Sequence, residues 1–96
     1  MEYDVVVWLD DLSDGSKCYA ALCPAVCRAH GQGDTEAEAL AEISKAIACF
    51  LELEPDRVKF GGAAQDDVEE LIAELVAEDV VPWLRKVAHP AVPAPA

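Results

Sequence analysis

The chain has 96 residues, of which 53% are hydrophobic, 19 are acidic and 7 are basic, so its formal net charge is −12. This length suits one domain, and the hydrophobic content is typical of a folded chain. The charge disfavours direct binding to nucleic acid and favours a basic protein partner, although an acidic chain with no charged partner is an open alternative. The sequence shows no membrane-spanning stretch and no signal peptide, so we expect a cytoplasmic protein.

Three strands are predicted in the first third of the sequence. Residues 3–9 alternate so that one face is uniformly apolar and should point to the core: Tyr3, Val5, Val7 and Leu9. Asp14 and Gly15 form an Asp-Gly pair that predicts a hairpin turn into a second strand, Lys17 to Cys23. Residues 25–32 are expected to form a shorter third strand, and hairpin-joined strands are antiparallel.

The junction between the third strand and the first helix is the sharpest local signal. Thr35 and Glu38 have capping-box spacing, in which the hydroxyl accepts from the Glu38 amide and the carboxylate reaches back to the Thr35 amide. Gly31 and Gly33 are expected to give the preceding turn its backbone freedom, and Asp34 suits the positive end of the helix dipole. We therefore predict a structural helix entry here, because the lysine and glycine spacing of a phosphate loop are absent.

A long helix is predicted over residues 36–53, and Pro55 should end it. Its apolar side chains fall on one stripe that should pack on the sheet. The members of this stripe are Leu40, Ile43, Ile47, Phe50 and Leu51, with Ala37 and Ala46 close by. Residues 56–60 are expected to be extended, with a break at the following two glycines.

A second helix is predicted from the capping-box-like pair Asp66 and Glu69 onward, over residues 66–79. Residues 80–87 are β-prone, and we expect a short final strand that could pair with the sheet or with a neighbouring subunit. The Pro- and Ala-rich tail, residues 89–96, should be extended. The prediction is thus a single α+β domain over residues 1–88, with a core at 3–53 and an extension at 56–88.

The cysteines and His30 form the one metal-like pattern in the sequence. Cys23, Cys27 and His30 are close in sequence, and Cys18 and Cys49 are possible further ligands. The spacing fits no standard zinc site, and strand alternation should send Cys18 and Cys23 to opposite faces. We therefore predict that these cysteines pack as small hydrophobic residues, and that Cys27 and His30 are not a nucleophile–base pair.

The aspartates offer a second possible metal site, at Asp4, Asp10 and Asp34, where Mg²⁺ would need converging carboxylates. Asp34 is better explained by the helix entry, so we expect no metal, no cofactor and no catalytic residue. Trp8 and Trp83 are the candidate partner-binding residues. Trp8 lies on the strand face opposite Tyr3, which either forms an interface or is covered by later elements within the same chain.

Several segments occur in an order that resembles the N-terminal domain of the HicB antitoxin family. They are the strand Tyr3-Asp4-Val5-Val6-Val7, the strand Tyr19-Ala20-Ala21-Leu22-Cys23-Pro24, the segment from Cys27 to Thr35, and Glu38-Ala39-Leu40 with Ala46-Ile47 on the helix. The resemblance covers residues 3–53. Members of the family often have Pro-Gly where this chain has Ala25-Val26.

The resemblance implies a βββα fold of the degenerate ribonuclease H type, with a three-stranded antiparallel sheet against a long helix. It also implies a non-enzymatic antitoxin or regulator that binds and neutralises a small, basic HicA-type ribonuclease toxin. Members often carry a DNA-binding C-terminal module, but residues 56–96 hold only four basic residues, so we expect no direct nucleic-acid binding. We expect homo-oligomers through residues 60–87. The alternatives are an orphan oligomeric binding module of the same fold and a hydrolase with a remnant acidic site.

Overall fold

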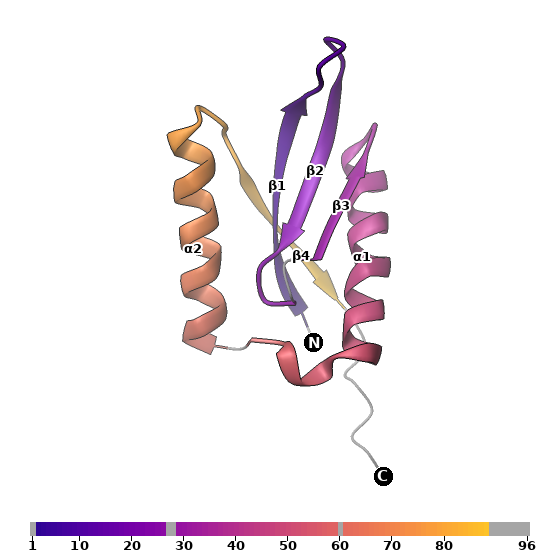
Figure 1. Ribbon diagram of the computed structural model, residues 1–96, viewed down its shortest axis with the longest axis vertical. Helices are drawn as coiled ribbons and strands as arrows, with labels where there is room; N and C mark the ends of the chain where they lie inside the picture. Colours follow the sequence, from indigo (N-terminus) through magenta and orange to yellow (C-terminus); the bar gives the residue numbers. More distant parts are fainter. Residues whose placement is uncertain (1, 27–28, 60, 89–96) are drawn as a thin grey trace.

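The computed structural model describes residues 2–26, 29–59 and 61–88. In chain order its elements are β1 (Glu2–Asp11), β2 (Lys17–Cys23), β3 (Ala29–Gly33), α1 (Glu36–Leu53), the 3-10 helix η1 (Pro55–Arg57), α2 (Gly61–Ala77) and β4 (Trp83–Ala88). The fold is therefore α+β, and Figure 1 shows the sheet between the two long helices. None of the helices in these ranges combines the length and the apolarity needed to cross a membrane.

The sheet has four antiparallel strands in the order β3-β2-β1-β4, which corrects the expected three. The final strand pairs with β1 along its whole length, from Trp83 opposite Val7 to Ala88 opposite Glu2. Pro82 lies just before this strand, where its missing amide hydrogen costs the ladder nothing. The predicted final strand thus exists, and it completes the sheet of its own chain.

Both faces of the sheet are covered, because α1 packs on one face and α2 on the other (Figure 1). Val5 and Val7 of β1 point into the α1 cluster with Ile43 and Ile47, whereas Val6 points into a smaller cluster with Val68 and other residues of α2. The predicted alternation of β1 therefore holds near its start. Leu9 departs from it with 41% exposure, because it lies towards the hairpin end of the strand and misses the helix.

Helix α1 begins as a capped helix. The Thr35 hydroxyl accepts a hydrogen bond from the Glu38 amide at 3.1 Å, as the capping box requires. The returning bond differs from the expectation, because the Glu38 carboxylate accepts from the amide of Asp34, at 2.8 Å, one residue before the cap. Ile43, Ile47 and Leu51 of the predicted stripe are buried, whereas Ala37 is exposed because it faces away from the sheet. Ala39, which was not predicted, is fully buried.

Gly31 and Gly33 serve a purpose other than the one the sequence suggested. Both lie inside β3, and the described glycine with a positive φ is Gly15, at 87° in the β1–β2 hairpin. A Cβ on Gly31 would lie 2.5 Å from the backbone nitrogen of Ile43, and one on Gly33 would lie 2.8 Å from that of Ala39. The glycines therefore let the helix backbone rest directly on the strand.

The connection between the helices is shorter and more regular than expected. Residues 55–57 form η1, and Val58 makes an isolated bridge with Val26 beyond β2. Helix α2 then starts at Gly61, five residues before the predicted capping pair at Asp66. Of the five residues before Asp66, Ala63, Ala64 and Gln65 have good helix propensity and extend the helix back to the two glycines. These glycines, which were expected to form a break, are instead its first two residues.

Candidate functional site

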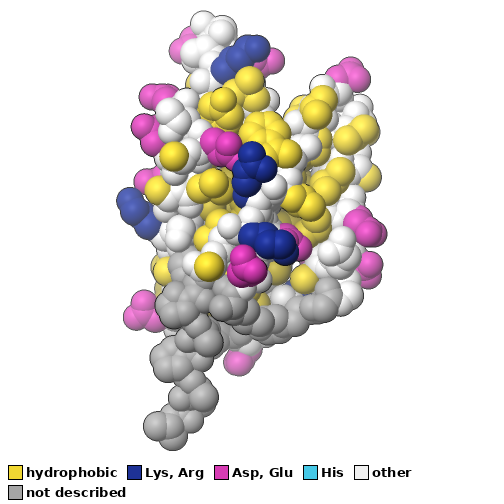
Figure 2. Space-filling view, turned by 180° about the vertical axis from the view of Figure 1, so that it is seen from behind, with side chains coloured by type: hydrophobic (Ala, Val, Ile, Leu, Met, Phe, Trp, Pro, Cys, Tyr) yellow, Lys and Arg dark blue, Asp and Glu magenta, His cyan; other side chains and the backbone are white. Residues whose placement is uncertain are grey.

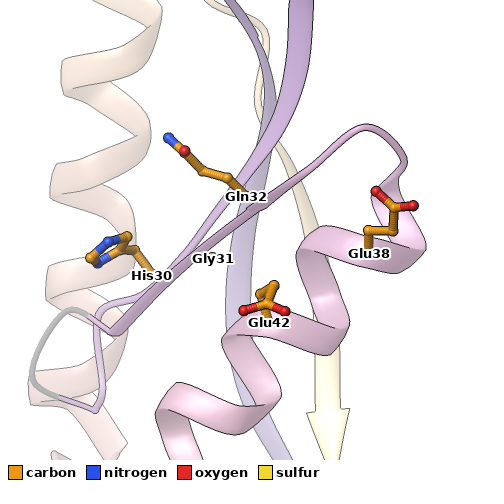
Figure 3. Close-up of a pocket in the computed structure, with 5 residues that line it drawn as sticks. All are labelled: His30, Gly31, Gln32, Glu38 and Glu42. Atoms are coloured by element: carbon orange, nitrogen blue, oxygen red, sulfur yellow. The ribbon is translucent and has the colours of Figure 1, made fainter.

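A pocket of about 420 Å³ lies where α1 crosses β3, the edge strand of the sheet. Its lining comes from two elements: His30, Gly31 and Gln32 on β3, and Glu38 and Glu42 on α1. Figure 3 shows the two acids on the helix side of the strand, while His30 and Gln32 point to the other side. The side chains thus border the strand on both sides, and glycine leaves the centre of the pocket without one.

The pocket is acidic. Glu38 and Glu42 stand one helical turn apart and are both exposed. The carboxylate of Glu38 accepts a hydrogen bond from the Asp34 amide, and that of Glu42 accepts one from the Lys45 ammonium at 3.3 Å. The Glu42–Lys45 ion pair is at the surface, where such a pair contributes little, so the Glu42 carboxylate can exchange it for a cationic partner group, whereas the Glu38 contact is part of the cap of α1.

The pocket exposes the edge of the sheet at β3, where a peptide could bind. An edge strand has backbone amides and carbonyls that are not used by its own sheet, and an extended peptide can pair with them. The two glutamates beside β3 favour an extended segment that carries Lys or Arg. Among the residues that the structure describes, the lining includes no cysteine, serine or threonine that could act as a nucleophile beside His30.

The other edge strand, β4, is fastened by Glu36 at the start of α1. Its carboxylate oxygen accepts from the indole N–H of Trp83 at 2.9 Å and lies 2.6 Å from the Arg85 Nε. The Trp83 ring also meets Tyr19 edge to face, with centroids 6.2 Å apart. The hydrogen bond from Trp83 and then the charge of Arg85 lower the pKa of Glu36 below its ordinary 4.5.

We expect Glu36→Gln to destabilise the protein at neutral pH. The pKa of Glu36 is lower in the folded state, so its stabilisation is complete above about pH 4.5 and is lost as the pH falls through the folded value. The urea midpoint of the variant should therefore lie below that of the parent at pH 7, and the gap should narrow below pH 4.5. An equal gap at pH 7 and pH 3 would contradict this role of the ionised carboxylate.

The structure places Trp8 and Trp83, the predicted partner-binding pair, on opposite faces of the sheet. Trp83 packs against the α1 cluster, and Trp8 packs against the α2 cluster. Both are partly buried within their own chain. The second helix thus covers much of the Trp8 face, as in the intramolecular alternative, and a role in partner binding stays a prediction for both residues.

The described cysteines do not converge. Cys23 is fully buried in the α1 cluster, where burial raises the pKa of its thiol to about 11, and Cys18 is buried on β2 while Cys49 is exposed on α1. Cys27 lies outside the described residues. Within the ranges that the structure describes, no group of three or more Cys, His, Asp or Glu side chains is arranged to hold a metal ion.

Sequence reasoning missed most of the pocket lining. The alternation rule, applied to β3, would have put His30 and Gln32 on one face and the glycines on the other. Glu36 was also missed as the residue that joins α1 to β4, because its partners lie 47 and 49 positions along the chain. Nothing local in the sequence marks such a long-range contact.

Comparison with known proteins gives a relative and a solved structure. No protein-family model matches the chain. Over 72 residues it is 33% identical to the UPF0150 protein ssl0738 of Synechocystis sp., covering 75% of this chain and 96% of that protein. The structure resembles the crystal structure of the N-terminal domain of the Burkholderia pseudomallei antitoxin HicB, with a TM-score of 0.56, 27% identity, and coverage of 93% of this chain and 100% of that one. The chain therefore belongs to the HicB-like (UPF0150) family.

Proposed function

We propose that this chain is a cytoplasmic antitoxin-type protein that binds and neutralises a small, basic HicA-type toxin through the acidic edge of its sheet. We define this acidic edge as β3 together with Glu38 and Glu42. HicB-type antitoxins are non-enzymatic regulators, so the chain is not an enzyme and exerts its function by binding. We further propose that residues 1–88 act as one domain in this role.

The observation that carries the proposal is the pocket at β3. An edge strand that is flanked by two exposed carboxylates and has glycine at its centre suits an extended cationic segment. The overall charge of −12 acts in the same direction, because a basic partner is drawn to the chain from a distance and associates faster. A hydrolase is not supported. Asp4, one of the three aspartates considered as a possible metal site, is paired with Lys86 at 3.0 Å.

Co-expression with the product of the adjacent gene tests the proposal. If that product is the toxin, the chain should restore growth and co-purify with it. Rescue of growth without co-purification would contradict direct neutralisation. An adjacent product that neither inhibits growth nor co-purifies would favour the orphan binding module.

The site itself is tested by reversing one charge in the pocket. Glu42→Lys should weaken the complex with the toxin about tenfold, because it removes a carboxylate beside the edge strand and puts a cation there. Isothermal titration calorimetry at low and at physiological salt would measure the change.

The matched control is Glu74→Lys. Glu74 is an exposed residue of α2, on the other face of the sheet, and its reversal changes the net charge by the same amount. If the two variants bind the toxin equally, net charge alone governs the affinity, and the acidic edge is not the binding site.

A further inference from the structure

The two edges of the sheet differ in charge. The strand β3, Ala29–Gly33, contains no Lys, Arg or Pro, which are residue types that usually keep a foreign strand away from an edge. The strand β4 contains Arg85 and Lys86, and Figure 2 shows Lys and Arg side chains in the middle of the face seen from behind, where β4 lies. A basic segment therefore meets cations at β4 and none on the strand itself at β3.

Helix α1 runs beside β3 in the opposite direction (Figure 3). A Cβ on Gly33 would touch Glu38, and one on Gly31 would lie 3.1 Å from the backbone carbonyl carbon of Glu42. One turn further along the helix, Ala46 packs against the α1 cluster, which includes the first residue of β3. From the end of β3 towards its start, the neighbouring helix positions are thus an acid, a second acid and an apolar residue.

The spacing of these three helix positions matches that of a strand. Residues four apart in a helix are separated by about 6 Å along its axis, and alternate residues of a strand by about 6.7 Å. A strand added to β3 therefore keeps step with Glu38, Glu42 and Ala46 over three side chains of one face. Because glycine occupies two of the three opposing positions of β3, these side chains can reach the helix without obstruction.

Both carboxylates can receive a cation. The Oε2 atom of Glu38 accepts from the Asp34 amide, and a carboxylate has about four acceptor sites, so Oε1 can accept from a partner group while the cap stays intact. The surface pair of Glu42 with Lys45 can be exchanged for such a group. The third side chain would lie beside Ala46, where a charge would lose water without gaining a partner, so an apolar residue is favoured there.

Direction follows from the sheet. Every strand pair that the structure describes is antiparallel, and an antiparallel partner of β3 runs from the Gly33 end towards the start of the strand. We propose that the acidic edge selects a strand of one direction, whose alternate residues facing α1 are, from N- to C-terminus, a cation, a second cation and an apolar residue. This rests on the proposed function for its basic protein partner, and it adds which kind of segment binds and which way it runs.

Two capped peptides test the direction. Thr-Lys-Thr-Arg-Thr-Val-Thr has the proposed order at alternate positions, and the reversed peptide Thr-Val-Thr-Arg-Thr-Lys-Thr has the same composition and charge. Titrated into the ¹⁵N-labelled chain, the first should bind about fivefold more tightly and shift the amide signals from His30 to Gly33. Equal affinity of the two peptides, or no shift of these signals with about 1 mM of the first, would overturn the proposal.

A charge exchange tests the register. Replacing the Arg of the first peptide by Glu should weaken binding to the parent about tenfold, and Glu42→Lys should restore it, because opposite charges then face each other again. Replacing the Lys by Glu instead should not be rescued by this variant, since that position faces Glu38. Glu74→Lys, on α2, should rescue neither peptide. Equal rescue of both peptides by Glu42→Lys would show that net charge governs binding and would overturn the register.

The peptide experiments and the proposed function fail separately. If the toxin binds the chain and Glu42→Lys weakens that complex, while the forward and reversed peptides bind equally, the proposed function stands and the direction is wrong. If the peptides follow the proposed order but the toxin does not bind, the preference of the acidic edge stands and the proposed partner is wrong.

Discussion

Gly31→Ala should lower the stability of this protein more than the addition of one methyl group usually does. The new Cβ would lie 2.5 Å from the backbone nitrogen of Ile43 and 2.7 Å from the carbonyl oxygen of Ala39. Backbone atoms of a long helix cannot move aside as a flexible side chain can, so α1 would have to lift from β3. We expect a loss of about 3 kcal/mol in the free energy of unfolding, measured by urea denaturation.

Gly62→Ala is the matched control for this substitution. Gly62 lies in the first turn of α2, and a Cβ there would meet nothing within 4 Å. Alanine has the higher helix propensity, so this variant should be as stable as the parent or more stable by up to about 1 kcal/mol. If the two alanine variants have equal midpoints, the close approach of α1 to β3 does not limit stability.

Ile43→Ala should lower the free energy of unfolding by a similar amount, because it leaves a cavity where Gly31→Ala causes a clash. Ile43 is fully buried at the centre of the α1 cluster, and its truncation leaves a cavity between helix and sheet. The expected loss is about 2–5 kcal/mol, whereas Leu53→Ala, at an exposed position of the same helix, should cost less than about 0.5 kcal/mol. Urea denaturation of the two variants side by side checks this.

The double variant of Gly31→Ala and Ile43→Ala separates two explanations of the first effect. The clash at Gly31 is with backbone atoms of α1, so removing the Ile43 side chain should not relieve it. Because the two residues are in contact, their losses need not add exactly, but the double variant should be less stable than Gly31→Ala alone. A double variant more stable than Gly31→Ala alone would show that the side chain, and not the helix backbone, limits the approach.

Much of the fold could be predicted from the sequence, because short-range patterns carry it. Alternation in residues 3–9, the Asp-Gly turn and the capping box at Thr35 each concern neighbours within a few positions. The fourth strand was harder to place, since its pairing with β1 joins Glu2 to Ala88. Its β-propensity was visible, but propensity does not say which strand it will join.

The candidate site was less predictable than the fold. Glu38 was correctly placed at the helix entry, yet its position beside β3 depends on how α1 crosses the sheet. That crossing is set by the two glycines, which the sequence suggested were turn residues. A glycine looks the same in sequence whether it serves a positive φ or a close contact, so the distinction came from the structure.

The pairing of β1 with β4 also means that the sheet cannot be completed until synthesis of the chain has passed β4. β1 leaves the ribosome before the other described strands, but its neighbour on one side is the last element described, more than 80 residues later in the case of Glu2 and Ala88. Until then, β1 is an edge strand of the partial sheet. Nascent or truncated chains that end before Trp83 should consequently expose this edge, along with the apolar residues of β1, to aggregation and proteolysis.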